Sequence, residues 1–355
     1  MFGTNVPDVM REATRLTLAG RLTEAMTLLR GAGAAPPLPS FREAYARYGS
    51  WSPRGGASSF WSKAPASGGA PALPGTFVKR THAGSAGARD YKVYVPSVAP
   101  GAPMPLVVML HGCTQSPDDF AAGTRMNEVA EAGGFVVAYP AQSASANCSK
   151  CWNWFKPGDQ RRGAGEPSLI AGITADLLRD HPVDPACVYI AGFSSGGAAA
   201  ATMAITYPDV YAALGVHSGL PHGAASDMPS AFSAMRGARR GGVRGTGAVV
   251  PAIVFHGERD TTVHPSNADA VIAQARSAAT TDLRRAVERH QPSGKRAYER
   301  TIHSRRDMPM FEQWLVHGAG HAWSGGSVTG TYTDPQGPDA AREMMRFFRR
   351  HRLAR

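Results

Sequence analysis

The chain has 355 residues, of which 43% are hydrophobic and 18% charged. This composition provides for a sizeable core and excludes a chain that is disordered throughout. No apolar stretch approaches the roughly 20 residues that a membrane-spanning helix needs, so the sequence excludes a transmembrane protein. The length permits two domains or one large α/β unit.

The net charge of +11 comes from 38 Lys and Arg against 27 Asp and Glu. Basic residues are densest in residues 236–244, 284–306 and 342–355. None of these stretches has the interleaving of basic and aromatic residues that is typical of proteins that bind single-stranded nucleic acid. The charge therefore predicts a solvated, arginine-rich surface and no nucleic-acid partner.

The first residues do not have the pattern of a secretory signal. Asp8, Arg11, Glu12 and Arg15 occupy the place where a signal peptide has its apolar segment. As written, the sequence predicts a cytoplasmic protein. A secreted protein whose signal had been removed would have the same sequence, so this second location stays open.

The first 75 residues are expected to form a helical hairpin and a connecting segment. Apolar residues recur at helical spacing on both sides of Gly20, which predicts a hairpin over residues 1–31. Residues 32–75 are rich in Ala, Gly, Pro and Ser, as a linker would be. They also contain aromatic residues such as Trp51 and Trp61, which favour a segment that lies against the main domain.

Residues 76–355 are predicted to form an α/β domain. Two antiparallel strands are expected around residues 77–81 and 91–94, followed by short apolar runs that alternate with helical patterns. Such runs are typical of parallel strands covered by helices on both faces. The expected strands are residues 106–110, 136–139, 188–191, 213–216 and 253–255, and the expected helices are residues 119–132, 169–180, 196–207, 266–278 and 337–351.

Residues 192–196, Gly-Phe-Ser-Ser-Gly, match the G-x-S-x-G pattern of a nucleophile elbow. The pattern alone is weak in a chain this rich in Gly and Ser, but here an apolar strand precedes it and a helix of small residues follows. That context predicts Ser194 as a nucleophile at a sharp strand-to-helix turn. The alternative is a glycine-rich turn without a catalytic role.

A serine nucleophile needs a base within hydrogen-bonding reach and a carboxylate that orients this base. Asp260 follows the apolar run of residues 253–255 in a Gly-containing loop. Such a loop lies at the carboxyl edge of a parallel sheet, where sites assemble, so Asp260 is the predicted acid. The alternative is an Asp that only caps the helix beginning near Pro265.

The predicted base is His321, in the Gly-rich loop that follows residues 311–316. His317 precedes it by four residues and is expected to be a packed or hydrogen-bonded structural residue. His290 and His351 lie in basic stretches and are expected to be solvated. The order Ser, Asp, His is the one that this strand-to-helix arrangement allows.

Donors for an oxyanion are expected from two backbone amides. One belongs to Ser195, directly after the nucleophile. The other belongs to Cys113, in the loop after residues 106–110, where Gly112 lets the backbone approach a substrate. Cys113 as the nucleophile is the rival interpretation, but no His-rich partner loop lies close to it in the sequence.

The four cysteines are too few for a disulfide scaffold in a chain of this length. Cys148 and Cys151 form one C-x-x-C motif, without the second ligand pair of a zinc site or the surroundings of a redox motif. The motif favours a local structural thiol pair, and neither a metal nor a cofactor is expected.

These segments together resemble the esterase family of polyhydroxybutyrate (short-chain polyhydroxyalkanoate) depolymerases, whose relatives include feruloyl and acetylxylan esterases. The resemblance runs from about residue 76 to residue 351. It implies an α/β-hydrolase fold, no cofactor, and the roles given above to the triad and the two amides. It is carried by DYKVYVP, PLVVMLHGCTQSPDDFA, YPAQSASANCSKCWNWF, GFSSGG, HGERDTTVHP and GAGHAWSGG.

The resemblance also implies which residues surround the cleft. Trp152, Asn153 and Trp154 would lie near it, and Trp323, two residues after the base, would line it. Without the family, the WNW cluster would be predicted as core.

A disulfide between Cys113 and Cys151 is also compatible with the family, with Cys148 as a competing partner. Extracellular depolymerases add a separate polymer-adsorbing domain, which nothing in this sequence resembles. Efficient attack on crystalline polymer is therefore not expected.

Three functions follow from these patterns. The leading hypothesis is a serine carboxylic-ester hydrolase that acts through an acyl-enzyme on short-chain polyhydroxyalkanoate, polyester or related short acyl esters. An esterase that removes feruloyl or acetyl groups from plant polysaccharide needs the same triad and is the alternative within the class. A non-catalytic protein that docks on polyester granules through its arginines is the alternative of another class.

Overall fold

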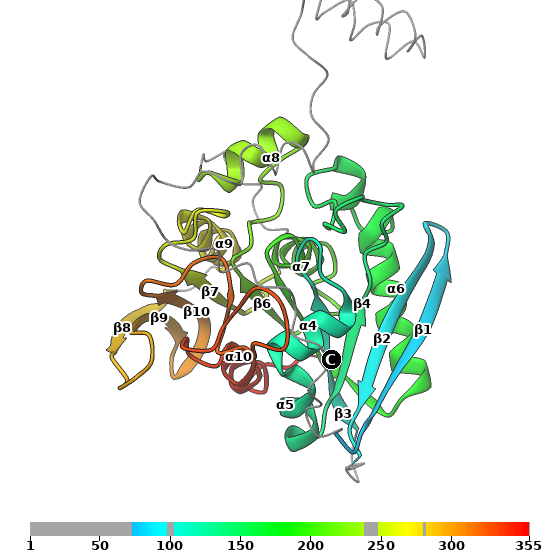
Figure 1. Ribbon diagram of the computed structural model, residues 1–355, viewed down its shortest axis with the longest axis horizontal. Helices are drawn as coiled ribbons and strands as arrows, with labels where there is room; N and C mark the ends of the chain where they lie inside the picture. The colour runs from blue at the N-terminus through cyan, green and yellow to red at the C-terminus, as the bar shows by residue number, and fades with distance from the viewer. Residues whose placement is uncertain (1–72, 98–102, 238–247, 280–281, 355) are drawn as a thin grey trace, which may run out of the picture. The chain divides into compact units, whose positions relative to one another are not determined.

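The computed structural model describes residues 73–97, 103–237, 248–279 and 282–354. The predicted hairpin over residues 1–31 lies outside these ranges, as does nearly all of the connecting segment 32–75. Their predicted structures stay predictions. The described part of the predicted α/β domain contains one large sheet, one short strand pair and helices on both faces of the large sheet (Figure 1).

The large sheet has ten strands in the order β1-β2-β4-β3-β5-β6-β7-β10-β9-β8. The six strands from β4 to β10 in this order are parallel, while β1 and β2 at one edge and β9 and β8 at the other are antiparallel to their neighbours. The bounds are β1 Thr76–Gly84, β2 Gly87–Val95, β3 Met104–Leu110, β4 Val136–Pro140, β5 Val183–Phe193, β6 Ala213–His217, β7 Ala252–Gly257, β8 Arg284–His290, β9 Tyr298–Arg305 and β10 Met308–Val316. The predicted α/β class, with its mostly parallel sheet, is therefore confirmed.

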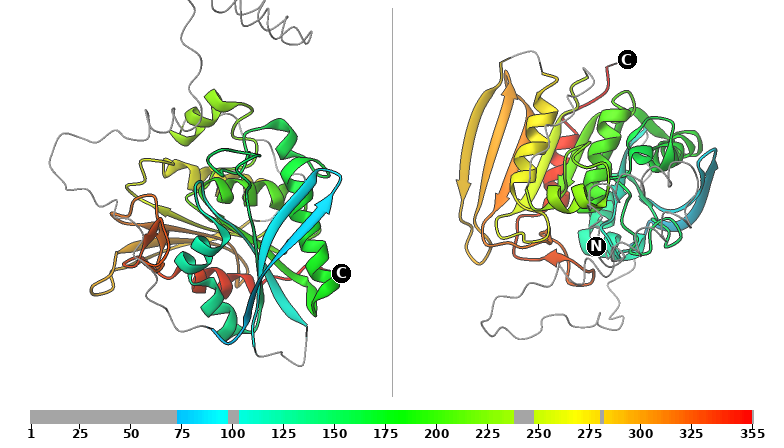
Figure 2. Two further views of the ribbon diagram at one scale, coloured as in Figure 1. Left: turned by 45° about the vertical axis from the view of Figure 1, so that its right-hand side comes forward. Right: turned by 90° about the horizontal axis from the view of Figure 1, so that it is seen from above.

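Alternating side chains of the buried strands build two cores, one on each face of the sheet. In β3, Leu106 and Val108 pack with helices α6, α7 and α9, whereas Val107 and Met109 pack with α4, α5 and α10. The ribbon of Figure 2 shows helices on both faces of the sheet. The helices are α4 Pro117–Thr124, α5 Met126–Gly133, α6 Gly165–Asp180, α7 Ser195–Thr206, α8 Met228–Met235, α9 Ser266–Arg276 and α10 Ala340–Phe348, with the 3-10 helix η1 at Pro157–Gln160 and the short strands β11 Trp323–Ser324 and β12 Thr333–Asp334.

Three details differ from the sequence-based expectation. The single helix expected over residues 119–132 is two helices, because Arg125 has a left-handed φ of 58° that ends α4. The hairpin of β8 and β9 and the helix α8 had not been predicted. The prediction that His351 is solvated was wrong: its side chain is buried, and its ring lies 4.6 Å from that of Phe347.

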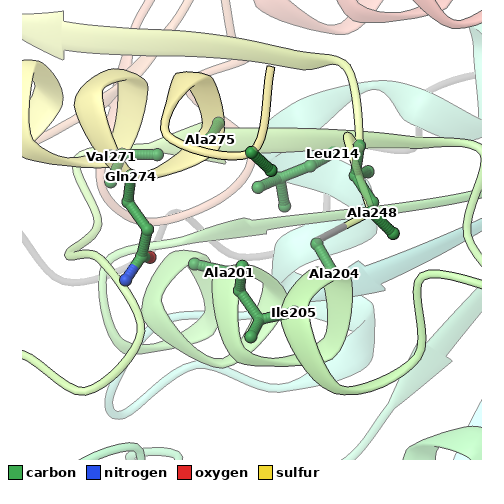
Figure 3. A pocket seen from close by; sticks show the side chains of 10 residues that line it. Ala201, Ala204, Ile205, Leu214, Ala248, Val271, Gln274 and Ala275 are labelled. Carbon is green, nitrogen blue, oxygen red and sulfur yellow. The ribbon is translucent and has the colours of Figure 1, made fainter. Parts of the chain in front are cut away.

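A small apolar pocket separates α7 from α9 above β6 (Figure 3). Ala201, Ala204 and Ile205 of α7 line it together with Val271 and Ala275 of α9. None of the residues predicted for catalysis lines this pocket. No helix in the described ranges is both long and apolar enough to cross a membrane.

Candidate active site

Ser194 stands at the turn between β5 and α7, where the backbone folds back sharply. Its φ of 56° and ψ of −120° are unusual for a residue with a side chain, as expected at a nucleophile elbow. The turn leaves no room beside it: a Cβ at Gly192 would lie 2.2 Å from the carbonyl oxygen of Gly196. A Cβ at Gly196 would lie 2.1 Å from the carbonyl oxygen of Leu110 in β3. Both glycines of the motif are therefore required by close backbone approach.

The structure brings the three predicted residues of the triad together. His321 Nε2 lies 2.9 Å from Ser194 Oγ, and His321 Nδ1 lies 2.7 Å from Asp260 Oδ2. Asp260 is in the loop after β7 and His321 is in the loop after β10, which is the parallel neighbour of β7. The two loops are in close contact, because a Cβ at Gly257 would lie 2.4 Å from the carbonyl oxygen of Gly320. This geometry lets Nδ1–H donate to the carboxylate while Nε2 accepts from the serine hydroxyl.

Asp260 is buried and surrounded by hydrogen-bond donors. Its Oδ1 accepts from the amides of Thr262 and Val263 at 2.9 Å each, and His256 Nε2 lies 3.3 Å from Oδ2. Burial by itself raises the pKa of Asp260, but the interactions with His321 and His256 outweigh it and hold the pKa well below its usual range. The carboxylate therefore stays ionised beside the histidine. None of its partners belongs to α9, and that helix has no side-chain cap, so the alternative role of Asp260 as a cap is not observed.

The backbone amides of Cys113 and Ser195 have no hydrogen-bond partner among the described residues, and the two residues are neighbours, with Cys113 Sγ 3.4 Å from Ser195 Oγ. The loop that holds Cys113 is fixed on either side, since Gly112 N donates to Gln115 Oε1 at 2.9 Å and Thr114 N donates to the carbonyl of Ser149 at 2.7 Å. Free amides in a fixed loop are the kind of donor that an oxyanion needs. The two amides predicted from the sequence are thus available for that role.

Cys113 and Cys151 form a disulfide bond, while Cys148 is free and exposed. The prediction of a local pair between Cys148 and Cys151 was therefore wrong, and the bridge compatible with the family is the one observed. The bond ties the Cys113 loop to the segment that follows β4. It also excludes the rival interpretation of Cys113 as a nucleophile, because a nucleophilic cysteine must be a free thiolate.

Removing this disulfide is expected to destabilise the fold. The bridge spans 38 positions, so its loss in a Cys113→Ala/Cys151→Ala variant is expected to lower the free energy of unfolding by about 2 to 4 kcal/mol. Urea denaturation of the variant and the oxidised wild type measures the difference. Cys148→Ala is the matched control and is expected to unfold like the wild type. Equal stability of the double variant and the wild type would contradict the expectation.

The tryptophans do not line an open cleft. Trp152 and Trp323 are 0% and 1% exposed, so the expectation that their side chains meet the substrate is corrected: both belong to the core beneath the site. Trp152 Nε1 donates to the carbonyl of His111 at 3.0 Å, and the ring of Trp323 stacks on His217. Trp154 retains 7% exposure and packs in a separate cluster of apolar residues.

Asn153, the fourth residue predicted at the cleft, is also buried, and its side-chain amide donates to Glu166 at 2.7 Å. Its interactions thus point to the protein interior. His317 is partly exposed and lies 3.3 Å from Glu258, which fits its predicted structural role.

Three residues that support the site were missed at the sequence level: His217, His256 and Glu166. His217 lies beneath the elbow, where its backbone carbonyl accepts from the amide of Ser194 and its Nε2 accepts from the amide of Ser324. A sequence signal for the two histidines exists, since each ends or nearly ends an apolar strand, ALGVH or AIVFHG. A polar residue within such a strand needs a buried partner.

No group of three or more His, Cys, Asp or Glu that could hold a metal ion occurs in the described ranges. The polar groups around Ser194 are instead paired with one another, as the hydrogen bonds above show. The arrangement is suited to moving a proton between a hydroxyl and an imidazole whose other ring nitrogen is hydrogen-bonded to a carboxylate.

A family model described as esterase PHB depolymerase matches residues 89–292. The chain belongs to this family. The match includes Ser194 and Asp260 and ends before His321, so the position of His321 rests on the structure.

Curated relatives of this esterase PHB depolymerase family member include a depolymerase and several esterases. The chain is 38% identical over 193 residues to poly(3-hydroxyalkanoate) depolymerase C of Paucimonas lemoignei, covering 51% of this chain and 46% of the relative. It is 32% identical over 200 residues to feruloyl esterase B of Thermothelomyces thermophilus, covering 51% of this chain and 67% of the relative. The match thus spans about half the length of the depolymerase.

Solved structures show the same fold. The acetyl xylan esterase from Aspergillus awamori superposes with a TM-score of 0.60 at 22% identity, covering 74% of this chain and 94% of that chain. An S-formylglutathione hydrolase from Agrobacterium tumefaciens superposes with a TM-score of 0.51 at 17% identity, covering 79% and 97%. These likenesses, together with the sheet topology, confirm the predicted α/β-hydrolase fold.

Proposed function

We propose that the protein is a serine carboxylic-ester hydrolase that acts through an acyl-enzyme. The observation that supports this most strongly is the continuous hydrogen-bonded path from Ser194 Oγ through His321 to Asp260. A hydroxyl at a strained turn, an imidazole within hydrogen-bonding reach of it and an ionised buried carboxylate are the groups that acyl transfer needs.

In the first step, Ser194 Oγ attacks the carbonyl carbon of the ester while its proton moves to His321 Nε2. The negative charge that develops on the carbonyl oxygen is stabilised by the amides of Cys113 and Ser195. The carbon–oxygen bond to the leaving alcohol then breaks, and the alkoxide takes the proton from His321. The product of this half-reaction is the acyl-serine and the free alcohol.

In the second step, water attacks the acyl-serine and gives a proton to His321 Nε2. The tetrahedral intermediate again places its oxyanion on the amides of Cys113 and Ser195. Ser194 leaves with the proton from His321, and the acid is released. Asp260 accepts the Nδ1–H bond throughout and stabilises the imidazolium that forms transiently.

For the substrate, we favour short-chain polyhydroxyalkanoate, polyester or related short acyl esters. The identity to a poly(3-hydroxyalkanoate) depolymerase, 38% over 193 residues, is higher than the 32% and 36% to two feruloyl esterases, the second over only 141 residues, and the 28% to a probable acetylxylan esterase. Removal of feruloyl or acetyl groups is the second candidate, because those relatives need the same chemistry. Single pocket groups shift the preference between such esters by about 1 to 3 kcal/mol.

A substrate panel tests this choice. Hydroxybutyrate oligomers, methyl ferulate and acetylated xylan are to be compared by kcat/KM on the full-length chain. The proposal expects the oligomers to be turned over at least about tenfold better than the other two, which corresponds to about 1.4 kcal/mol. Faster cleavage of methyl ferulate or acetylated xylan would replace the proposed substrate while leaving the ester hydrolase in place.

A further inference from the structure

A buried carboxylate stands behind the site, at the start of α6. Glu166 is 6% exposed, and three N–H groups surround it. Its Oε2 accepts from the backbone amide of Asn153 at 2.8 Å, and its Oε1 accepts from the side-chain amides of Asn153, at 2.7 Å, and Gln142. Every partner of this carboxylate is thus a donor.

The side-chain amides of Gln142 and Asn153 cannot flip and so exchange the places of their oxygen and NH₂ groups. The oxygen of Gln142 accepts from Arg89 Nη1, and the oxygen of Asn153 accepts from Asn147 Nδ2 at 3.2 Å. Flipping either amide would set two donors against each other. The cluster therefore requires a side chain at position 166 that accepts on both oxygens, as a carboxylate does and an amide does not.

The electrostatic setting of Glu166 has opposing contributions. Burial raises the pKa of the Glu166 carboxyl above its usual range, Asp159 adds to this rise, and the hydrogen bonds from Asn153 and Gln142 offset only part of it. The buried Arg89 guanidinium, held on Gln142, is the nearby cation of the cluster. Removing a partner from such a buried polar group is strongly destabilising, so Asn153 and Gln142 are held in one geometry around Glu166.

The partners of Glu166 are joined to the loop that carries Cys113. Gln142 N donates to His111 Nε2 at 3.1 Å, and Gln142 Nε2 also donates to the carbonyl of Cys151 at 2.9 Å. Trp152, next to Asn153, donates to the carbonyl of His111 at 3.0 Å. The segment from Gln142 to Asn153 is therefore hydrogen-bonded to the start of the Cys113 loop and supports it.

We propose that Glu166 is a positioning residue for oxyanion stabilisation: through Gln142 and Asn153 it fixes the segment that holds His111 and Cys113, and so aims the Cys113 amide. This inference rests on the proposed ester hydrolase function. A donor displaced by a fraction of an ångström stabilises the transition state less, while binding of the ground-state ester is little affected.

The test is Glu166→Gln, which keeps the shape of the side chain and replaces one acceptor by a donor. With p-nitrophenyl butyrate, kcat is expected to fall by about 10- to 100-fold with KM changed by less than about twofold. The affinity for a boronic acid that mimics the tetrahedral intermediate is expected to fall in parallel with kcat/KM. If Glu166 had only a structural role, the boronic acid affinity and kcat/KM would not fall in proportion to each other.

Glu312→Gln is the matched control. Glu312, in β10, is also buried, at 1% exposure, and it accepts from Arg346 Nη1 at 3.1 Å. Among the described residues it makes no hydrogen bond to the Cys113 loop. This variant is expected to lose stability but to keep kcat and the boronic acid affinity. If Glu166→Gln does not fold, Gln142→Met, which removes the side-chain links but keeps the backbone amide to His111, is expected to give the same pattern more weakly.

Two results would overturn the inference. One is Glu166→Gln, or Gln142→Met in its place, with wild-type kcat and boronic acid affinity. The other is a loss of activity in Glu166→Gln that only follows the fraction of unfolded protein, with kcat per folded molecule unchanged. Either result leaves the proposed function intact as long as the wild type hydrolyses the ester, whereas a wild type without activity towards any ester of the panel contradicts the proposed function itself.

Discussion

Replacing Ser194 with alanine is expected to lower kcat for p-nitrophenyl butyrate by at least about ten-thousandfold, because losing the nucleophile removes the covalent step altogether. The fold is expected to survive. Alanine keeps the Cβ that already occupies the turn, and the hydroxyl contributes one hydrogen bond, to His321, worth about 1 kcal/mol. Initial rates, together with thermal unfolding of both proteins, measure the two effects.

Ser195→Ala is the matched control for this variant. It removes the adjacent hydroxyl but keeps the backbone amide, so most of the activity is expected to remain. A fluorophosphonate probe should label the wild type and Ser195→Ala but not Ser194→Ala. Equal labelling of all three proteins would assign the nucleophile elsewhere, and a folded wild type that is neither labelled nor active would favour the non-catalytic granule-binding alternative.

The triad could be predicted from the sequence because each member follows an apolar strand of the parallel sheet. Ser194 comes after β5, Asp260 after β7 and His321 after β10. Parallel strands present all their carboxyl ends at one edge, and β5, β6, β7 and β10 are consecutive neighbours. Apolar runs and glycines therefore placed three residues in one region although more than sixty positions separate each from the next.

The surroundings of the triad could not be predicted in the same way. Trp152 and Trp323 carry the same aromatic rings whether they line a cleft or fill a core. Only the contact of His111 with Trp152, and of Phe120 in α4 and His217 in β6 with Trp323, decides for the core. Glu166 follows a glycine in a polar stretch, and nothing local shows that Gln142, twenty-four positions earlier, donates to it. Such roles depend on contacts between distant segments, which periodicity does not encode.

The edge strand β8 was not predicted from the sequence because its residues are mostly basic. The arginines of residues 284–290 led to the prediction of a solvated basic surface and of no strand there, yet these residues form β8 and pair with β9 in a regular antiparallel register. Basic side chains on an edge strand discourage pairing with further chains, so the same residues that hid the strand suit its position. His351 was misjudged for the same reason, since the basic residues around it are exposed while its ring packs on Phe347.

Replacing Asp260 with asparagine is expected to lower kcat/KM by about a thousand- to ten-thousandfold. Four N–H groups converge on this carboxylate, and an asparagine would turn its own NH₂ group towards two of them. If that group faces His321, the imidazole is driven into the tautomer that carries the proton on Nε2 and cannot accept from Ser194. Glu258→Gln, two residues earlier in the same loop, is the matched control and is expected to keep its activity, because the side chain of Glu258 is hydrogen-bonded to His317 and Gly318, outside the triad.

The same variant gives a stability test in which the direction of the pH effect is fixed. Because the pKa of Asp260 is held below its usual range in the folded chain, its ionised form contributes stability at neutral pH, and this contribution is lost as the pH falls below the ordinary aspartate value of about 3.9. The difference in unfolding free energy between wild type and Asp260→Asn should therefore be largest near pH 7 and shrink at pH values below about 4, as urea denaturation at several pH values would measure. A difference in unfolding free energy that does not change with pH would mean that His321 and His256 do not hold the carboxylate ionised. That result would contradict the electrostatic argument for Asp260 as the residue that orients the base.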